Sequence, residues 1–289
     1  MNTIKNGTII TIIGASCWGF SGACAQFLFS NYQISAITLT IYRMFFGGLF
    51  LVGYSYIKDR KKTIDIIVNK ESLIQLTLFT LIGLIPSQLF YLITIDYSNA
   101  ATATVLQYCG PAIIMIYICF KQKRLPLKSE FIALIMVSIG VFLLATHADI
   151  SNLAISHIAL IFGILSAFGF FFYSIIPYKL LKTYGSMITT GYGLLLGSII
   201  LFITLRPKMI LNFDIYAYFA LIAMIVIGTI IAYSFYLYGN LIIGPKRASI
   251  YACLEPVTAT ILSIIWLHTL FSNFDLMGII LIIIAVIIL

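Results

Sequence analysis

Arg43 and Glu255 are charged residues that the sequence places near the middle of long apolar stretches. A charge at that depth of a membrane costs at least about 2.5–3.5 kcal/mol, so each side chain must face an aqueous cavity, meet a partner or lose its charge. Glu255 can hold a proton or contact a cationic group, and Arg43 can contact a carboxylate. Alternatively, the two residues pair with each other or with backbone carbonyls and only fix helix packing.

Amide and aromatic side chains surround these two positions. Amides are rare in the middle of membrane helices and therefore indicate a lined cavity, whereas the tyrosines are a weaker signal because many must face lipid or the interface. The candidate substrate-binding residues are Trp18, Arg43, Gln88, Tyr91, Gln107, Tyr173, Tyr233, Tyr251 and Glu255.

Pro111 and Pro256 each lie inside an apolar stretch, and a proline within a helix removes a donor and crowds the preceding turn. Each therefore predicts a helix kink, which exposes backbone carbonyls to a cavity or merely shapes the bundle. The five cysteines lie in apolar runs without C-x-x-C spacing, so we expect no metal site, and nothing in the sequence indicates a cofactor.

The apolar stretches themselves are long enough to cross a membrane as helices, at about 20 residues each. Hydrophobic residues make up 62% of the chain and charged residues 9%, which excludes an ordinary soluble domain. We predict an all-α membrane protein of ten transmembrane helices, near residues 7–28, 35–57, 73–95, 99–120, 130–146, 156–178, 187–205, 215–238, 247–267 and 274–289.

The basic residues orient these helices. If both termini are cytoplasmic, the inside loops hold nearly all lysines and arginines, and the outside loops hold only Arg206 and Lys208. This distribution follows the positive-inside rule, and it explains the net charge of +8 without nucleic-acid binding. We expect an integral protein of a bacterial plasma membrane.

A weak internal repeat relates the two halves at a constant offset of 145 residues. Ala103 aligns with Ala248, Pro111 with Pro256, and Tyr91 with Tyr236. Five helices per half is an odd number, so the second half must enter the membrane in the opposite orientation. The sequence therefore predicts two inverted five-helix repeats, residues 1–147 and 148–289, with a binding site between them.

The residues quoted above resemble the EamA family of the drug/metabolite transporter superfamily. The resemblance rests on Trp18-Gly19, on Arg43 within LTIYRMFFGGLFL, and on the stretch ASIYACLEPVTA with Glu255-Pro256. It implies a ten-helix inverted-repeat fold, a central cavity, alternating access and transport of small metabolites, with functional weight on Trp18 and Glu255. The first half departs from the family, because Gly110-Pro111 stands where that resemblance implies Glu-Pro.

The leading hypothesis is a secondary transporter that exports a small polar metabolite, an amino acid or related compound, with proton coupling or exchange at Glu255. Import of an amine or nucleobase is the alternative, and a non-transporting structural or sensory membrane protein is the alternative of another class. An enzyme is disfavoured because the spans offer one acid and no histidine. The expected partners are the substrate and membrane lipid, and a homodimer is compatible with the sequence.

Overall fold

The computed structural model is all-helical in the residues that it describes, which are 2–32, 34–147, 154–208, 213–243, 251–252 and 254–288. Seven stretches of this described part are long and apolar enough to cross a membrane. They are Ile4–Tyr32, Ala36–Lys58, Lys70–Asp96, Ala100–Lys121, His157–Ile175, Ser186–Leu205 and Ile215–Tyr236. Two shorter apolar helices, Leu254–Ile265 and Asn273–Ala285, follow. The structure thus agrees with an all-α membrane protein, and the ten spans and the inverted repeat remain predictions.

The first half begins with two long helices and continues through shorter pieces. Their bounds are α1 (Asn2–Tyr32), α2 (Ala36–Lys58), α3 (Arg60–Val68), α4 (Lys70–Leu78), η1 (Phe79–Leu84), η2 (Pro86–Phe90), α5 (Tyr91–Asp96), α6 (Ala100–Gln107), α7 (Gly110–Lys121) and α8 (Lys128–Thr146). Short polar side chains start several of them: Ser35, Asn69 and Asn99 each accept a hydrogen bond from a backbone N–H of the first turn.

The second half has a similar order of long and interrupted helices. Its elements are α9 (His157–Ile175), α10 (Tyr178–Tyr184), α11 (Ser186–Leu205), α12 (Ile215–Ile225), η3 (Val226–Ile231), α13 (Ala232–Ile243), α15 (Leu254–Ile265) and α16 (Asn273–Ile288). Asp214 caps α12 by accepting from the Ala217 N–H at 2.8 Å. Lys246 and Arg247, which the prediction of orientation used, lie outside the described residues.

Two of the spans contain π-helical turns, in which each carbonyl bonds five residues ahead. These turns are η1 and η2 in the span from Lys70 to Asp96, and η3 in the span from Ile215 to Tyr236. A π turn inside an α-helix displaces the backbone register and is frequent at functional sites. Both interruptions lie close to residues that the sequence singled out, Gln88 and Tyr233.

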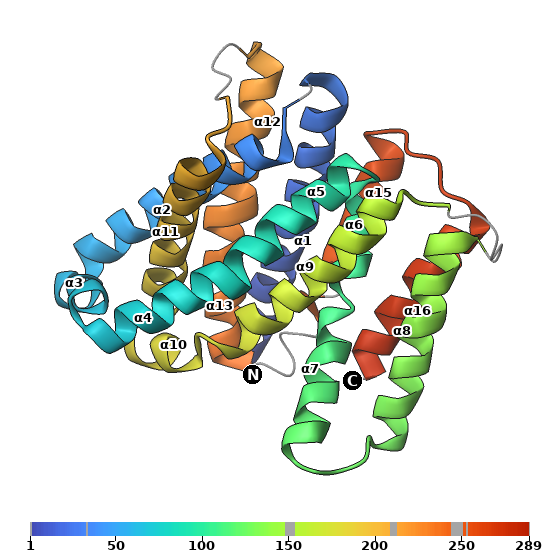
Figure 1. Cartoon of the computed structure of the whole chain (residues 1–289), viewed down its shortest axis with the longest axis horizontal. Coiled ribbons are helices and arrows are strands. Elements are labelled where there is room, and N and C mark those ends of the chain that lie inside the picture. The colour runs from blue at the N-terminus through green and yellow to red at the C-terminus, as the bar shows by residue number, and fades with distance from the viewer. Residues whose placement is uncertain are drawn as a thin grey trace.

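The helices pack in pairs and around α1 (Figure 1). Helix α2 lies along α11, α8 lies along α16, and α1 contacts α12, α13 and α15. Glycines permit these approaches: a Cβ on Gly14 would lie 2.7 Å from the Tyr236 N atom, and a Cβ on Gly48 would lie 2.7 Å from the Leu195 N atom. Side chains such as Leu49, Phe50 and Ile203 are about half exposed, as expected of a surface that faces lipid.

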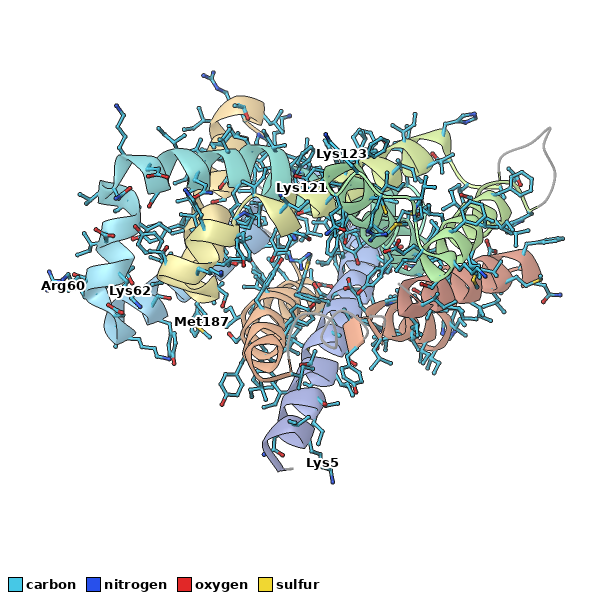
Figure 2. All side chains as sticks on the ribbon, turned by 90° about the horizontal axis from the view of Figure 1, so that it is seen from below. Lys5, Arg60, Lys62, Lys121, Lys123 and Met187 are labelled. Carbon is cyan, nitrogen blue, oxygen red and sulfur yellow. The ribbon has the colours of Figure 1, made fainter. Side chains whose placement is uncertain are left out.

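The beginning of α1, the end of α16 and the α7–α8 connection all lie toward the same end of the molecule in Figure 1. Figure 2, which shows that end from below, displays Lys5, Arg60, Lys62, Lys121 and Lys123. Five of the basic residues that the sequence placed in inside loops are therefore seen from this end, while the opposite end carries the end of α1 and the start of α12.

Candidate functional site

A small polar pocket lies among the helices of both halves. About 60 Å³ of it is open, which is room for a few water molecules at about 10–15 Å³ each. The pocket is lined by Trp18, Arg43, Ser87, Gln88, Tyr91, Gln107, Phe170, Tyr173, Tyr233 and Glu255. We call it the central pocket.

Trp18 enters the central pocket from α1 and is held by aromatic neighbours on α13. Its ring centroid lies 5.3 Å from that of Tyr233, in an edge-to-face arrangement, and 4.8 Å from that of Tyr236. The indole Nε1–H is buried and has no hydrogen-bond partner. A buried donor without a partner is costly, so its position in the pocket wall makes it available to a ligand.

Arg43 enters from α2 and is only 5% exposed. Its Nε donates to Thr229 Oγ1 at 3.1 Å and its Nη2 donates to the Gly228 carbonyl at 3.3 Å, both on η3. The alternative that this arginine contacts a backbone carbonyl is therefore present in the structure, while the described ion pairs include none between Arg43 and Glu255. Arg43 ties α2 to the π turn and still lines the pocket.

Glu255 is the second residue of α15 and is 9% exposed. Its Oε2 accepts a hydrogen bond from the Tyr108 hydroxyl at 3.2 Å, and the same hydroxyl contacts the Ala252 carbonyl. Tyr108 lies in the short break between α6 and α7, so the carboxylate is held by the first half of the chain although it belongs to the second.

The amides complete the walls. Gln88 Nε2 donates to the Tyr233 hydroxyl at 3.1 Å, whereas Gln88 Oε1 is buried without a partner. Gln107 Nε2 donates to the Ser87 carbonyl at 2.9 Å, on η2. Tyr91 OH lies 3.0 Å from Thr104 Oγ1. The pocket thus presents a carboxylate, a guanidinium, a free acceptor and a free donor, which together can bind a solute that carries both signs of charge.

Eight of the nine residues predicted to bind substrate line this pocket, and the exception is Tyr251, which is not among the lining residues. Sequence reasoning missed Ser87 and Phe170, since a serine or phenylalanine in an apolar run carries no distinctive signal. Pro111 lies in the first turn of α7, after the break at Tyr108, and Pro256 is the third residue of α15. Tyr251 and Ala252 before α15 are helical as well, and Pro111 lies inside the span Ala100–Lys121, so the two helix kinks stay predictions.

A larger cavity lies on the side of the basic residues and is lined by Lys58, Lys62 and Lys182. Its free volume is about 980 Å³, and we call it the vestibule. Neighbouring residues line the two spaces: Tyr173 and Tyr233 line the central pocket, and Ser174 and Ser234 line the vestibule. The other residues of the vestibule are Tyr54, Ser55, Asp59, Tyr178, Leu181, Tyr184, Gly185, Ser186, Met187, Ile188 and Tyr238.

The far end of the bundle is tied by polar contacts. Gln26 on α1 donates to Thr269 Oγ1 at 2.9 Å and accepts from the Ala100 N–H at 2.8 Å and from Ser263 Oγ at 3.2 Å. Within the described residues, no three His, Cys, Asp or Glu side chains gather as a metal site.

Comparison with known proteins agrees with this geometry. A model of the EamA-like transporter family matches residues 5–146 and again residues 157–289. The inner membrane transporter YicL of Salmonella typhimurium, described as uncharacterized, is 36% identical over 289 residues that cover 99% of this chain and 96% of that protein. One crystal structure has a similar fold, with a TM-score of 0.66 and 14% identity over 96% of this chain and 95% of its own.

A helical membrane protein with a polar pocket between its halves and relatives of this kind is a transmembrane transporter, not an enzyme. The chain belongs to the EamA-like transporter family, as the resemblance of its sequence motifs predicted. It is an integral membrane protein, and its relative is a protein of the bacterial inner membrane.

Proposed function

We propose that this transporter is a secondary carrier that exports a small zwitterionic metabolite, an amino acid or a related compound, from the cytoplasm of a bacterium. The central observation is that Arg43 and Glu255 line one buried pocket without forming an ion pair with each other. Two buried charges of opposite sign that do not neutralise each other suit a ligand with both charges.

The unpartnered atoms extend this match. An ammonium group would donate to the Glu255 carboxylate and to Gln88 Oε1, while a carboxylate would accept from Arg43 and from Trp18 Nε1. The open space of about 60 Å³ is smaller than an amino acid needs, so binding requires the walls to move. Such movement is what alternating access demands.

The predicted inverted repeat gains support from two observations. The family model matches the chain twice, once in each half. In addition, Gln88 and Tyr233, which are 145 residues apart, hydrogen-bond to each other in the central pocket. At the predicted offset these residues are each other's equivalents, and equivalent residues meet only near an axis that relates two halves. This contact favours a pocket on that axis, as in other inverted-repeat carriers.

The two ends of the bundle favour a carrier open toward one side. Helix α2 begins beside the tied end and ends at Lys58 in the vestibule, and its 23 residues span about 35 Å. The vestibule carries the lysines, so the positive-inside rule assigns it to the cytoplasm together with both termini. In this proposal Glu255 is the coupling residue. Its carboxylate binds either a proton or the ammonium group of the substrate, so that the two can exchange there.

A thermal-shift screen of the purified protein tests binding with amino acids, amines, carboxylates and nucleobases, since a ligand that binds only the folded state raises Tm. The screen is repeated at two pH values with Glu255→Gln and with Glu71→Gln, whose side chain is 81% exposed, as the matched control. We expect a zwitterionic ligand to stabilise the parent and Glu71→Gln equally, with a pH dependence that Glu255→Gln abolishes.

Other results point elsewhere. A response to amines or nucleobases alone would favour the import alternative, which substrate uptake into right-side-out vesicles would then decide. A response to amino acids that Glu255→Gln leaves unchanged would remove the coupling role from Glu255 while keeping the substrate class.

A further inference from the structure

The lining of the vestibule carries more positive than negative charge. Lys58 at the end of α2, Lys62 on α3 and Lys182 on α10 line it, against one acid, Asp59. Asp59 is already engaged, because its Oδ1 accepts from the Lys62 N–H at 3.1 Å and its Oδ2 lies 3.9 Å from Lys62 Nζ. Figure 2 shows Lys62 and Met187, two residues of this wall from different elements, on the basic face of the molecule.

A second acid, Asp65, lies at the wall of the vestibule because it contacts Tyr184, whereas Glu71 is paired outside the vestibule. Asp65 on α3 accepts a hydrogen bond from the Tyr184 hydroxyl at 2.9 Å, and Glu71 on α4 forms an exposed ion pair with Lys179 at 3.3 Å. Burial raises the pKa of Tyr184, and the Asp65 carboxylate adds to that rise, so this hydroxyl stays neutral. Lys182 Nζ lies 4.6 Å from the centroid of the Tyr178 ring, a cation–π contact that brings no negative charge to the lysine.

The remaining wall suits an anion with an apolar part. Ser186 and Tyr238 bring hydroxyl groups to the vestibule beside Leu181 and Met187, whereas the Ser174 hydroxyl already donates to the Phe170 carbonyl at 2.8 Å. Hydroxyls and ammonium groups are the donors that carboxylate and phosphate oxygens accept from, and the apolar side chains offer contact to a carbon skeleton. The free volume of about 980 Å³ admits a whole small metabolite.

We infer that the vestibule is an anion-binding antechamber, which receives the carboxylate or phosphate group of a solute before that solute reaches the central pocket. The passage onward rests on the proposed transport function, whereas the anion site itself does not. The same chemistry is offered by a soluble anion and by the headgroup of an acidic phospholipid. The experiment must therefore first measure the electrostatic potential in the vestibule and then identify the source of the anion.

The reactivity of a cysteine in place of Ser174 measures the electrostatic potential in the vestibule without any transport assay. Ser174 is exposed, lines the vestibule and is next in sequence to Tyr173 of the central pocket. We would measure how fast Ser174→Cys reacts with an anionic and with a cationic methanethiosulfonate, subtracting the parent protein and dividing by the rates of a free thiol. We expect a normalised ratio of anionic to cationic reaction rates above one, and we expect it to fall as salt is added.

Variants that remove single charges test whether the residues of the vestibule cause that ratio. Lys182→Gln should lower it by about two- to fourfold at low salt, because a unit charge that acts over roughly 10 Å in water affects the two reagents in opposite directions. Lys179→Gln is the matched control, since Lys179 lies on the same helix but does not line the vestibule, and it should change the ratio far less. Asp59→Asn retains a capping side chain and should raise the ratio.

The composition of the nanodisc and of the buffer then distinguishes a lipid headgroup from a soluble anion. Nanodiscs that contain phosphatidylglycerol, compared with phosphatidylcholine alone, should slow modification of the cysteine if a headgroup occupies the site. Millimolar succinate or inorganic phosphate in phosphatidylcholine nanodiscs should slow it if a soluble anion does. Either result supports the antechamber.

The inference is overturned by a normalised ratio at or below one, by equal effects of the Lys179 and Lys182 variants, or by a rate that neither acidic lipid nor soluble anion changes. Each of these outcomes leaves the thermal-shift test of the central pocket intact. An absence of any ligand response in that screen, conversely, leaves the thiol-reactivity ratio of the vestibule interpretable.

Discussion

Replacing Gly19 by alanine should disturb the contact that positions Glu255. A Cβ at Gly19 would lie 2.5 Å from the Glu255 carbonyl oxygen, 2.8 Å from Thr258 Cβ and 2.9 Å from the Ala259 N atom. Ordinary contacts of a Cβ begin near 3.4 Å, so α1 and α15 must separate by roughly 0.5–0.9 Å. Two of the three neighbours are backbone atoms, which cannot rotate away. Overpacking of this kind costs about 1–3 kcal/mol.

The assay is thermal unfolding of the purified protein, followed by the ligand screen. At about 2–4 °C per kcal/mol for a large domain, Gly19→Ala should lower Tm by roughly 2–12 °C. Gly53→Ala is the matched control: this residue lies on α2 and a Cβ there meets nothing within 4 Å. It should leave Tm unchanged or raise it slightly, because alanine favours a helix over glycine. Equal Tm values for the two variants would refute the rigid α1–α15 contact.

Three further variants test other parts of the structure. Gln26→Leu leaves the Ala100 N–H without its acceptor and should lower the free energy of unfolding by about 1–3 kcal/mol, measured by thermal unfolding. A Tm equal to that of the parent would show that this hydrogen bond does not hold the far end together. Asp214→Ala removes the cap of α12 and should cost about 0.5–2 kcal/mol, with Asp214→Asn as the tolerated control. Trp18→Phe breaks no described hydrogen bond and should therefore change Tm little. Because it removes the Nε1 donor, it should weaken ligand binding about five- to tenfold. A lower Tm with unchanged binding would exclude Nε1 as a ligand contact.

Much of the site could be predicted because lipid makes polar residues conspicuous. Arg43, Gln88, Gln107 and Glu255 stand in stretches where each polar atom carries a free-energy cost, and all four line the central pocket. The tyrosines were harder, since aromatic residues also serve at interfaces. Tyr251 illustrates the difficulty, as its place in a quoted motif suggested a pocket contact that the lining does not include.

The partner of each charge could not be predicted. Arg43 meets the Gly228 carbonyl and Thr229 because η3 is π-helical there, and a run such as VIGTII has the same composition as an ordinary helix. Likewise, Tyr108 meets Glu255 because α6 and α7 are separated by a short break. Sequence periodicity predicts that a span exists, while local departures from the α-helix decide which side chains meet.

The vestibule was invisible to the sequence for a different reason. Its lysines were counted as markers of topology, and topology alone explains them. Only the tertiary structure shows that Lys58, Lys62 and Lys182, from three separate elements, line one cavity instead of spreading over the surface.

The π turn η3 also restricts how this gene can change in length. A π turn holds one more residue than the α-helical turn it replaces, and deletion of a single residue from Val226–Ile231 would restore a regular helix at low cost. Because the wider turn absorbs the extra residue, side chains after the deletion would keep their places around the helix axis. Tyr233 would still face Gln88 and Tyr236 would still face Trp18, whereas Gly228 and Thr229 would lose their present places opposite Arg43. A one-codon deletion in this segment would therefore preserve the fold and the aromatic wall while removing the anchor of Arg43.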